Sequence, residues 1–226
     1  MIANIVLEYF MQGGPVMWPI LISALVAVAV VGERAFWWLR ESTRREPRKL
    51  EQILAALENK DTAAATKIAA SSEDPVIRVI GHGLEHVGHS HGSLLGALQL
   101  AAGIELKRAG RFLTVMDTLV TLAPLLGLLG TVTGLMRAFL HIGSAALSVT
   151  DVTGGIGEAL IATACGLGIA IFSLIPFNYF SARVAQLQFD LETAATNVEV
   201  MVGGGAKTGD TVHLHRHESP GQATTH

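Results

Sequence analysis

Three long windows without a charged residue constrain the fold of this chain more than any other feature of its sequence. They cover residues 13–32, 118–136 and 159–182. A helix needs about 20 residues to cross the hydrocarbon core of a bilayer. The whole chain is 50% hydrophobic and 15% charged, with a mean hydropathy of +0.45, which is too apolar for an ordinary soluble domain. We therefore expect an all-α integral membrane protein with three transmembrane helices.

The positions of lysine and arginine predict how the spans are oriented. Of the 16 basic residues, 12 lie between Arg34 and Arg111, and none precedes the first window. Because basic residues concentrate on the cytoplasmic side, we expect the N-terminus outside and the C-terminus inside. The expected segments are a short outer N-terminus (1–14), spans at 15–38, 116–140 and 151–180, a cytoplasmic helical segment (39–115), an outer hairpin (141–150), a cytoplasmic helical extension (181–202) and a disordered, His-containing tail (203–226).

The segment between the first two spans shows helical patterning. Leu50, Ile53, Leu54 and Leu57 recur at helical spacing. Asp61 is a candidate N-cap for a second short helix, which we expect Pro75 to close. From Ser93 the pattern meets the second span without a break until Pro124. It predicts one helix of roughly 40 residues, about 60 Å long, that extends into the cytoplasm.

Small residues in the second and third windows are typical of close helix packing in membranes. Pro124 and Pro176 can kink or break their helices. The residues that we expect at helix contacts are Pro124, Gly127, Gly130 and Gly134 in the second window, with Gly154, Gly157, Ala162 and Gly166 at the third. This packing role does not explain the one acidic residue of the same region, Glu158.

Glu158 is costly if it lies inside the bilayer, because a buried carboxylate there costs on the order of 3 kcal/mol. If the third span starts near Val152, Glu158 lies about 9 Å below the outer surface. It then either faces a pore or a partner helix, or it lies at the water-exposed end of a span that starts after it. Thr163 on the same span and Thr131 on its neighbour favour the first alternative, since hydroxyls can satisfy a buried polar group. Such hydroxyls can equally bond to their own backbone.

Histidine clusters raise the question of a metal site. The stretch "HGLEH" (His82, Glu85, His86) fits a pattern of zinc hydrolases, but the segment is small and supplies no good third ligand. We expect a solvated, glycine-rich loop there. His213, His215 and His217 could bind a transition metal weakly, or lie in a tail with no specific role. We expect neither a resident metal nor a cofactor.

Two further counts exclude other classes of protein. A net charge of −3 without a basic field argues against nucleic acid as a partner. The single cysteine, Cys165, excludes an internal disulfide.

Two stretches of the sequence resemble a known family. "APLLGLLGTVTGLM" (123–136), followed after a short hairpin by "GIGEALIATACGLGIAIF" (155–172) and Asn178, is similar to the paired signature of the MotA/TolQ/ExbB family, and most similar to its ExbB and TolQ branch. The resemblance covers the second and third spans almost completely and is looser over the first. Phe172 stands where the family usually has proline, with Pro176 one turn later, and Gly157 stands where alanine is frequent.

The resemblance implies a homo-oligomeric ring, typically a pentamer, in the bacterial inner membrane. Its second and third spans would enclose the single-span helix of an ExbD- or TolR-like subunit, with a TonB- or TolA-like transducer beyond. The proton motive force would drive movement, and Thr131, Thr163 and Glu158 would line the proton pathway. Some members use sodium instead. Such a subunit is not expected to be an enzyme.

Three functions are therefore in competition. The first is an ion-conducting motor subunit. The second is a scaffold that packs partner helices and conducts nothing, and the third is a zinc hydrolase that uses "HGLEH". They differ in what Glu158→Gln does, because only the motor needs the charge of Glu158.

Overall fold

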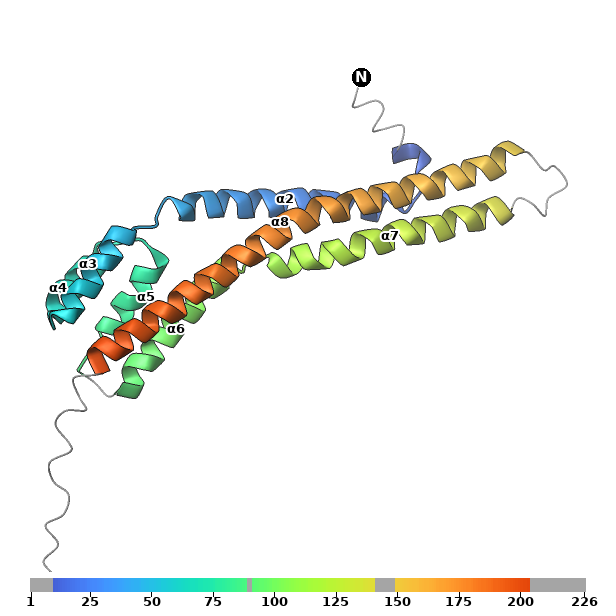
Figure 1. The fold of residues 1–226 in the computed structure, drawn as a ribbon. Helices are drawn as coiled ribbons and strands as arrows, with labels where there is room; N and C mark the ends of the chain where they lie inside the picture. Colours follow the sequence, from blue (N-terminus) through green and yellow to red (C-terminus); the bar gives the residue numbers. More distant parts are fainter. Residues whose placement is uncertain (1–9, 89–90, 141–148, 204–226) are drawn as a thin grey trace, which may run out of the picture. The chain divides into compact units, whose positions relative to one another are not determined.

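The computed structural model describes residues 10–88, 91–140 and 149–203, and every long element among them is an α-helix (Figure 1). In chain order the helices are α2 (Met17–Ser42), α3 (Pro47–Glu58), α4 (Thr62–Ala70), α5 (Pro75–Leu84), α6 (His91–Ala109), α7 (Leu113–Leu140) and α8 (Val149–Gly203). Helical stretches within Met17–Ser42, Gly92–Leu140 and Val152–Val202 are long and apolar enough to cross a membrane. The expected all-helical class with three candidate spans is confirmed.

The chain divides into two compact units, which are described separately below. The transmembrane unit comprises Met1–Arg44 and Leu106–Gln188, and the helical unit comprises Arg45–Glu105 and Phe189–His226. Helices α6 and α8 contribute residues to both. The candidate spans therefore belong to the first unit, together with all residues expected to carry ions.

In the transmembrane unit, α2, α7 and the first part of α8 run side by side, with α7 and α8 antiparallel (Figure 1). Buried positions recur every three or four residues along one face of α7, as a helix packed on one side requires. These positions are Met116, Leu119, Ala123, Gly127, Gly130, Gly134 and Ala138.

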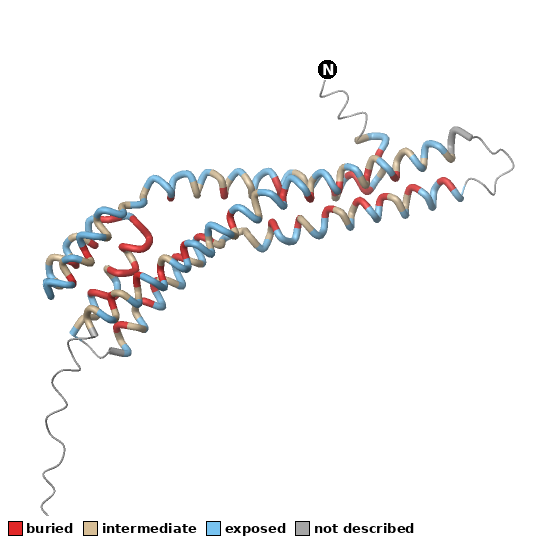
Figure 2. Tube along the Cα trace, in the orientation of Figure 1, coloured by how far each residue is buried: buried red, intermediate tan, exposed pale blue. Residues whose placement is uncertain are grey.

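The outward faces of the spans carry large apolar side chains. Trp18 on α2, Leu125 on α7 and Ile171 on α8 are at least 60% exposed, and exposed positions alternate with buried ones along all three helices (Figure 2). A continuous apolar surface of this kind is unfavourable in water but suits contact with lipid. The transmembrane unit is therefore a small helical assembly whose interior is narrow and whose outer surface is adapted to hydrocarbon.

The helix expected to continue unbroken from Ser93 into the second span is interrupted. α6 ends at Ala109 and α7 begins at Leu113, and Phe112 between them adopts a φ of 64°, a left-handed conformation that bulky residues rarely take. The buried Arg34 of α2 donates Nη1 hydrogen bonds to the carbonyl oxygens of Arg108 and Ala109, at 3.1 and 3.2 Å. The expectation failed because a distant side chain satisfies the last carbonyls of α6, which would otherwise need a continuing helix.

The helical unit is built as the apolar pattern predicts. Ile53 and Leu57 are buried on α3, and the Asp61 side chain accepts a hydrogen bond from the Ala64 amide at 2.9 Å, which confirms it as the N-cap of α4. The expectation that Pro75 closes α4 was wrong. Pro75 is the first residue of α5, because proline lacks an amide hydrogen that the first turn of a helix does not use.

A polar cluster ties the start of α3 to the start of α5. The Ser72 hydroxyl donates to the Glu46 carboxylate, and Lys49 Nζ lies 3.0 Å from the same group. Both contacts favour the charged form, so they lower the pKa of Glu46 below its usual value, with the Ser72 hydrogen bond as the larger cause. The backbone amide of Glu46 also donates to the Asp74 carboxylate at 2.8 Å, which adds a second link between these two segments.

Candidate ion pathway between α7 and α8

Glycines bring the backbones of α7 and α8 into direct contact. A Cβ atom added to Gly130 would lie 2.3 Å from Cβ of Ala162, and one added to Gly127 would lie 3.0 Å from Cα of Thr163. At Gly134 the added atom would meet the Gly155 carbonyl oxygen at 2.8 Å. Any larger side chain at these positions would force the helices apart.

The same fit is visible from α8. A Cβ atom at Gly166 would lie 2.5 Å from the Ala123 carbonyl oxygen. Gly155 faces Ala138, whose Cβ would be 2.8 Å away. By contrast, an atom added to Gly154 or Gly157 would meet no other part of the described chain within 4 Å. The packing position at this end of α8 is therefore Gly155, and the chain itself supplies no contact for the two glycines that we expected there.

Thr163 lies on this contact face. Its hydroxyl is 3.1 Å from the Gly127 carbonyl oxygen on α7 and 3.1 Å from the Ala159 carbonyl oxygen on its own helix. A hydroxyl carries one proton, so it can donate to one carbonyl at a time and can exchange between them. Thr163 therefore places a movable polar hydrogen between the two spans.

Thr131 takes a different position. Its hydroxyl donates to the Leu128 carbonyl oxygen of its own helix at 2.6 Å. Of the two alternatives for such hydroxyls, Thr131 thus shows the bond to its own backbone. No hydrogen bond joins Thr131 to Thr163 or to Glu158 within the described residues.

Glu158 meets two other elements. Arg137 of α7 donates from Nη1 to Oε1 of Glu158 at 2.9 Å, and the Glu158 side chain is only 13% exposed. On another side lies Gly14, in the turn before α2, where an added Cβ atom would fall 1.7 Å from the same oxygen. Gly14 has a φ of +70°, so this position requires glycine both for its backbone and for the space that Glu158 occupies.

The prolines lie inside helices. Pro124 is within α7 and Pro176 within α8, and neither ends its helix. Pro124 adjoins Ala123, whose carbonyl faces Gly166. Because proline removes one amide donor from the helix, the α7 backbone carries one hydrogen bond fewer close to this contact.

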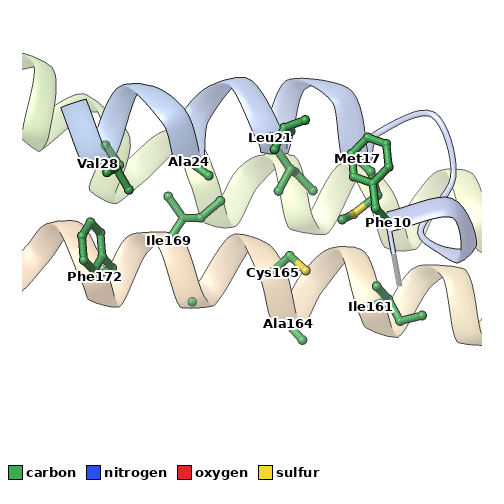
Figure 3. A pocket seen from close by; sticks show the side chains of 13 residues that line it. Phe10, Met17, Leu21, Ala24, Val28, Ile161, Ala164, Cys165, Ile169 and Phe172 are labelled. Carbon is green, nitrogen blue, oxygen red and sulfur yellow. The ribbon is translucent and has the colours of Figure 1, made fainter. Parts of the chain in front are cut away.

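An apolar groove of about 620 Å³ lies between α2 and α8 (Figure 3). Met17, Leu21 and Val28 line it from α2, while Ile161 and Phe172 line it from α8. No lining side chain carries a nitrogen or oxygen atom. A charged ion would lose its hydration in this groove without replacement. The polar groups that could carry an ion are instead on the α7 side of α8.

Comparison with known proteins decides the family. The sequence model of the MotA/TolQ/ExbB proton channel family matches residues 71–193, which is more than half of the 226-residue chain. The chain belongs to the MotA/TolQ/ExbB proton channel family. It is therefore a multi-pass membrane protein and, like the channel subunits of this family, not an enzyme.

Relatives named ExbB or ExbB-like are similar to this chain over lengths that range from 39% to 79% of it. The biopolymer transport protein ExbB-like 3 of Synechocystis is 38% identical over 75% of this chain and 82% of its own length. The biopolymer transport protein ExbB of Neisseria gonorrhoeae is 38% identical over 39% of this chain and 40% of its own length. The biopolymer transport protein ExbB homolog of Methanothermobacter thermautotrophicus is 25% identical over 79% of this chain and 64% of its own length.

Two residues of this MotA/TolQ/ExbB chain that contact Glu158 escaped sequence reasoning. Arg137 directly follows the second charge-free window, and Gly14 lies inside the first. A signal existed for Arg137, because an arginine at the edge of a span needs a counter-charge and Glu158 is an acidic residue across the hairpin. No comparable signal pointed to Gly14.

The "HGLEH" motif that suggested a metal does not form a metal site with the other described residues. His82 lies in α5, Glu85 and His86 follow its end, and His86 Nδ1 is 2.9 Å from the His82 carbonyl oxygen. "HGLEH" is thus the last turn of a helix and its cap, not the loop we expected. Among residues 10–88, 91–140 and 149–203, no three His, Cys, Asp or Glu side chains are placed to hold a metal ion. His213, His215 and His217 lie outside the described residues.

Proposed function

We propose that this chain is the proton-conducting subunit of an inner-membrane motor that uses the proton motive force to drive an outer-membrane process. ExbB-like TonB-dependent transport and TolQ-like envelope maintenance are the two candidate processes. The family assignment and the ExbB relatives support this proposal. One observation carries it furthest: Glu158 is a carboxylate that is 13% exposed within an otherwise apolar helical hairpin.

The proposed assembly is a homo-oligomeric ring, with a pentamer as the expected form. The N-terminus would lie in the periplasm and the C-terminus in the cytoplasm. Its partners would be a single-span ExbD- or TolR-like subunit, a TonB- or TolA-like transducer and membrane lipids. The basic residues between Arg34 and Arg111 support this orientation.

In this mechanism the chain supplies a fixed polar wall. Glu158 and Thr163 lie five residues apart on α8, about 7.5 Å along the helix axis. The membrane potential is worth about 2.3 kcal/mol per charge per 100 mV. Each proton that passes would be bound in turn by these side chains and by an acidic group of the partner. The energy of the membrane potential would in this way be converted into movement. Thr131 would extend the wall on α7.

The test is potential-driven proton uptake by vesicles that contain this protein and its single-span partner. We expect Glu158→Gln to reduce uptake at least about tenfold, a barrier increase of ~1.4 kcal/mol, and Thr131→Ala and Thr163→Ala to reduce it less. Glu192→Gln is the matched control, because Glu192 is an exposed residue of α8 in the helical unit, and it should leave uptake unchanged. Replacing protons by sodium tests the identity of the ion.

The runner-up is a non-conducting scaffold for partner helices. The interlocked glycines of α7 and α8 favour it, since packing alone explains them. A scaffold predicts that wild-type vesicles show no uptake above lipid vesicles, and that Glu158→Gln retains full biological activity. That pair of results would replace the channel proposal.

A further inference from the structure

We infer that Arg137 is a positioning residue for Glu158, which holds the carboxylate in one orientation between the spans. The inference about geometry stands on the contacts of this chain. Its consequence for conduction rests on the proposed function.

The first argument is the ion pair itself. Arg137 Nη1 lies 2.9 Å from Glu158 Oε1, the usual length of a charge-assisted hydrogen bond. The two residues are on different helices of one hairpin, so the contact joins α7 to α8. Among the described residues, Arg137 is the one side chain with a hydrogen bond to the Glu158 carboxylate.

The second argument is burial. The Glu158 side chain is 13% exposed, whereas that of Arg137 is 47% exposed. A carboxylate with little access to solvent needs a compensating charge, and removing one partner of such a pair leaves the other charge uncompensated. The charge of the half-exposed Arg137 is partly solvated, so it requires a counter-charge less than the carboxylate does. The charge of Glu158 therefore depends on Arg137 more than that of Arg137 depends on Glu158.

The third argument is the space around Oε1. Gly14 approaches this oxygen so closely that an added Cβ atom would be 1.7 Å away. The turn before α2 therefore fills the space next to this oxygen. Because this space is filled and the same oxygen is bonded to Arg137, the carboxylate has little freedom to turn.

A consequence for conduction follows. A proton that binds to Glu158 neutralises the carboxylate and removes its attraction for Arg137, so proton binding and pair formation compete.

The experiment measures the reactivity of the Glu158 carboxyl group, which we expect to rise when the bond to Arg137 is lost. The full chain, in native membranes, is treated with dicyclohexylcarbodiimide, which modifies protonated carboxyl groups in apolar surroundings, and modification of Glu158 is quantified by peptide mass spectrometry. We expect Arg137→Gln to raise the modification of Glu158 about tenfold, equivalent to ~1.4 kcal/mol. Arg137→Lys, which keeps the positive charge, should remain near the wild-type level. Glu158→Gln provides the background.

Arg183→Gln is the matched control, because Arg183 is an arginine of α8 that bonds to Tyr179 and not to Glu158. It should leave modification unchanged. The inference is overturned if Arg137→Gln labels like the wild type, or if Arg137→Lys labels as strongly as Arg137→Gln. Solubilised oligomers of each variant are compared by size, so that a misfolded variant is recognised. If Arg137→Gln misfolds, the labelling of Arg137→Lys decides the result.

Proton uptake by vesicles with the partner subunit separates this inference from the proposed function. If Arg137→Gln changes both labelling and uptake, the positioning role extends to conduction. If labelling responds but wild-type vesicles take up no protons, the channel proposal fails while the pairing of Arg137 with Glu158 stands.

Discussion

Gly130 of α7 and Ala162 of α8 face each other so closely that a Cβ atom on the glycine would lie 2.3 Å from that of the alanine. Neither residue can be enlarged without moving a helix. Gly130 directly precedes Thr131 in the sequence, and Ala162 directly precedes Thr163. Packing and the candidate pathway thus share one face of the hairpin, and variants that disturb packing must be separated from those that remove polar groups.

Gly130→Ala should destabilise the protein by about 1–3 kcal/mol, because the new methyl group overlaps Ala162. The double variant Gly130→Ala with Ala162→Gly moves the methyl group to the other helix and should recover most of this loss. Thermal unfolding of the detergent-solubilised protein measures both. Gly157→Ala, where the added atom meets open space, is the control. Equal destabilisation at Gly130 and Gly157 would contradict the close approach.

Gly14→Ala should be more harmful than Gly88→Ala. Both glycines have positive φ, of 70° and 102°, so both substitutions incur backbone strain of roughly 1–2 kcal/mol. Only at Gly14 does the new atom also collide with Glu158. We expect a larger fall in thermal midpoint for Gly14→Ala and higher carbodiimide modification of Glu158. If the two variants behave alike, the Gly14 turn does not restrain Glu158.

Arg34→Met should weaken the junction between α6 and α7. The side chain is 1% exposed and donates to two terminal carbonyls of α6, so its loss should cost about 2 kcal/mol. Trypsin should then cleave faster after Arg111, within the junction. Arg40→Met, at an exposed position of the same helix, should change neither the thermal midpoint nor the cleavage rate.

Ser72→Ala should show a pH-dependent loss of stability. The pKa of Glu46 is lowered in the folded protein, so its stabilising contribution is present above the unfolded value, near 4.3, and is lost as pH falls through the folded value. The difference in thermal midpoint between wild type and Ser72→Ala should therefore be larger at pH 7 than below about pH 4. Ser71→Ala removes a hydroxyl that donates only to the Ile68 carbonyl in the described contacts and should show no such pH dependence.

The sequence was sufficient to predict most of the helices, because their signals are local. Charge-free windows mark the spans, and the apolar spacing and the cap residue Asp61 mark the short helices. The break at Phe112 could not be predicted in this way. It depends on Arg34, which is 74 residues from its carbonyl partner Arg108, and no local pattern encodes such a contact.

The candidate site was predictable in part. Glu158 stands out because a charge in an apolar window is rare, and a family resemblance adds Thr131 and Thr163. The bond between Thr163 and the Gly127 carbonyl, and the approach of Gly14 to Glu158, depend on how three helices are aligned. Spacing along one helix says which residues share a face, but not which atoms of another helix they meet.

The interlocking of α7 and α8 restricts the ways in which this protein can move. Backbone atoms of one helix fill the gaps left by glycine on the other, from Gly134 and Gly155 at one end to Gly166 and Ala123 at the other. Neither helix can slide along its neighbour without its carbonyls striking the next side chain. A displacement of one helix along its axis is therefore transmitted to the other, so that the two spans move together.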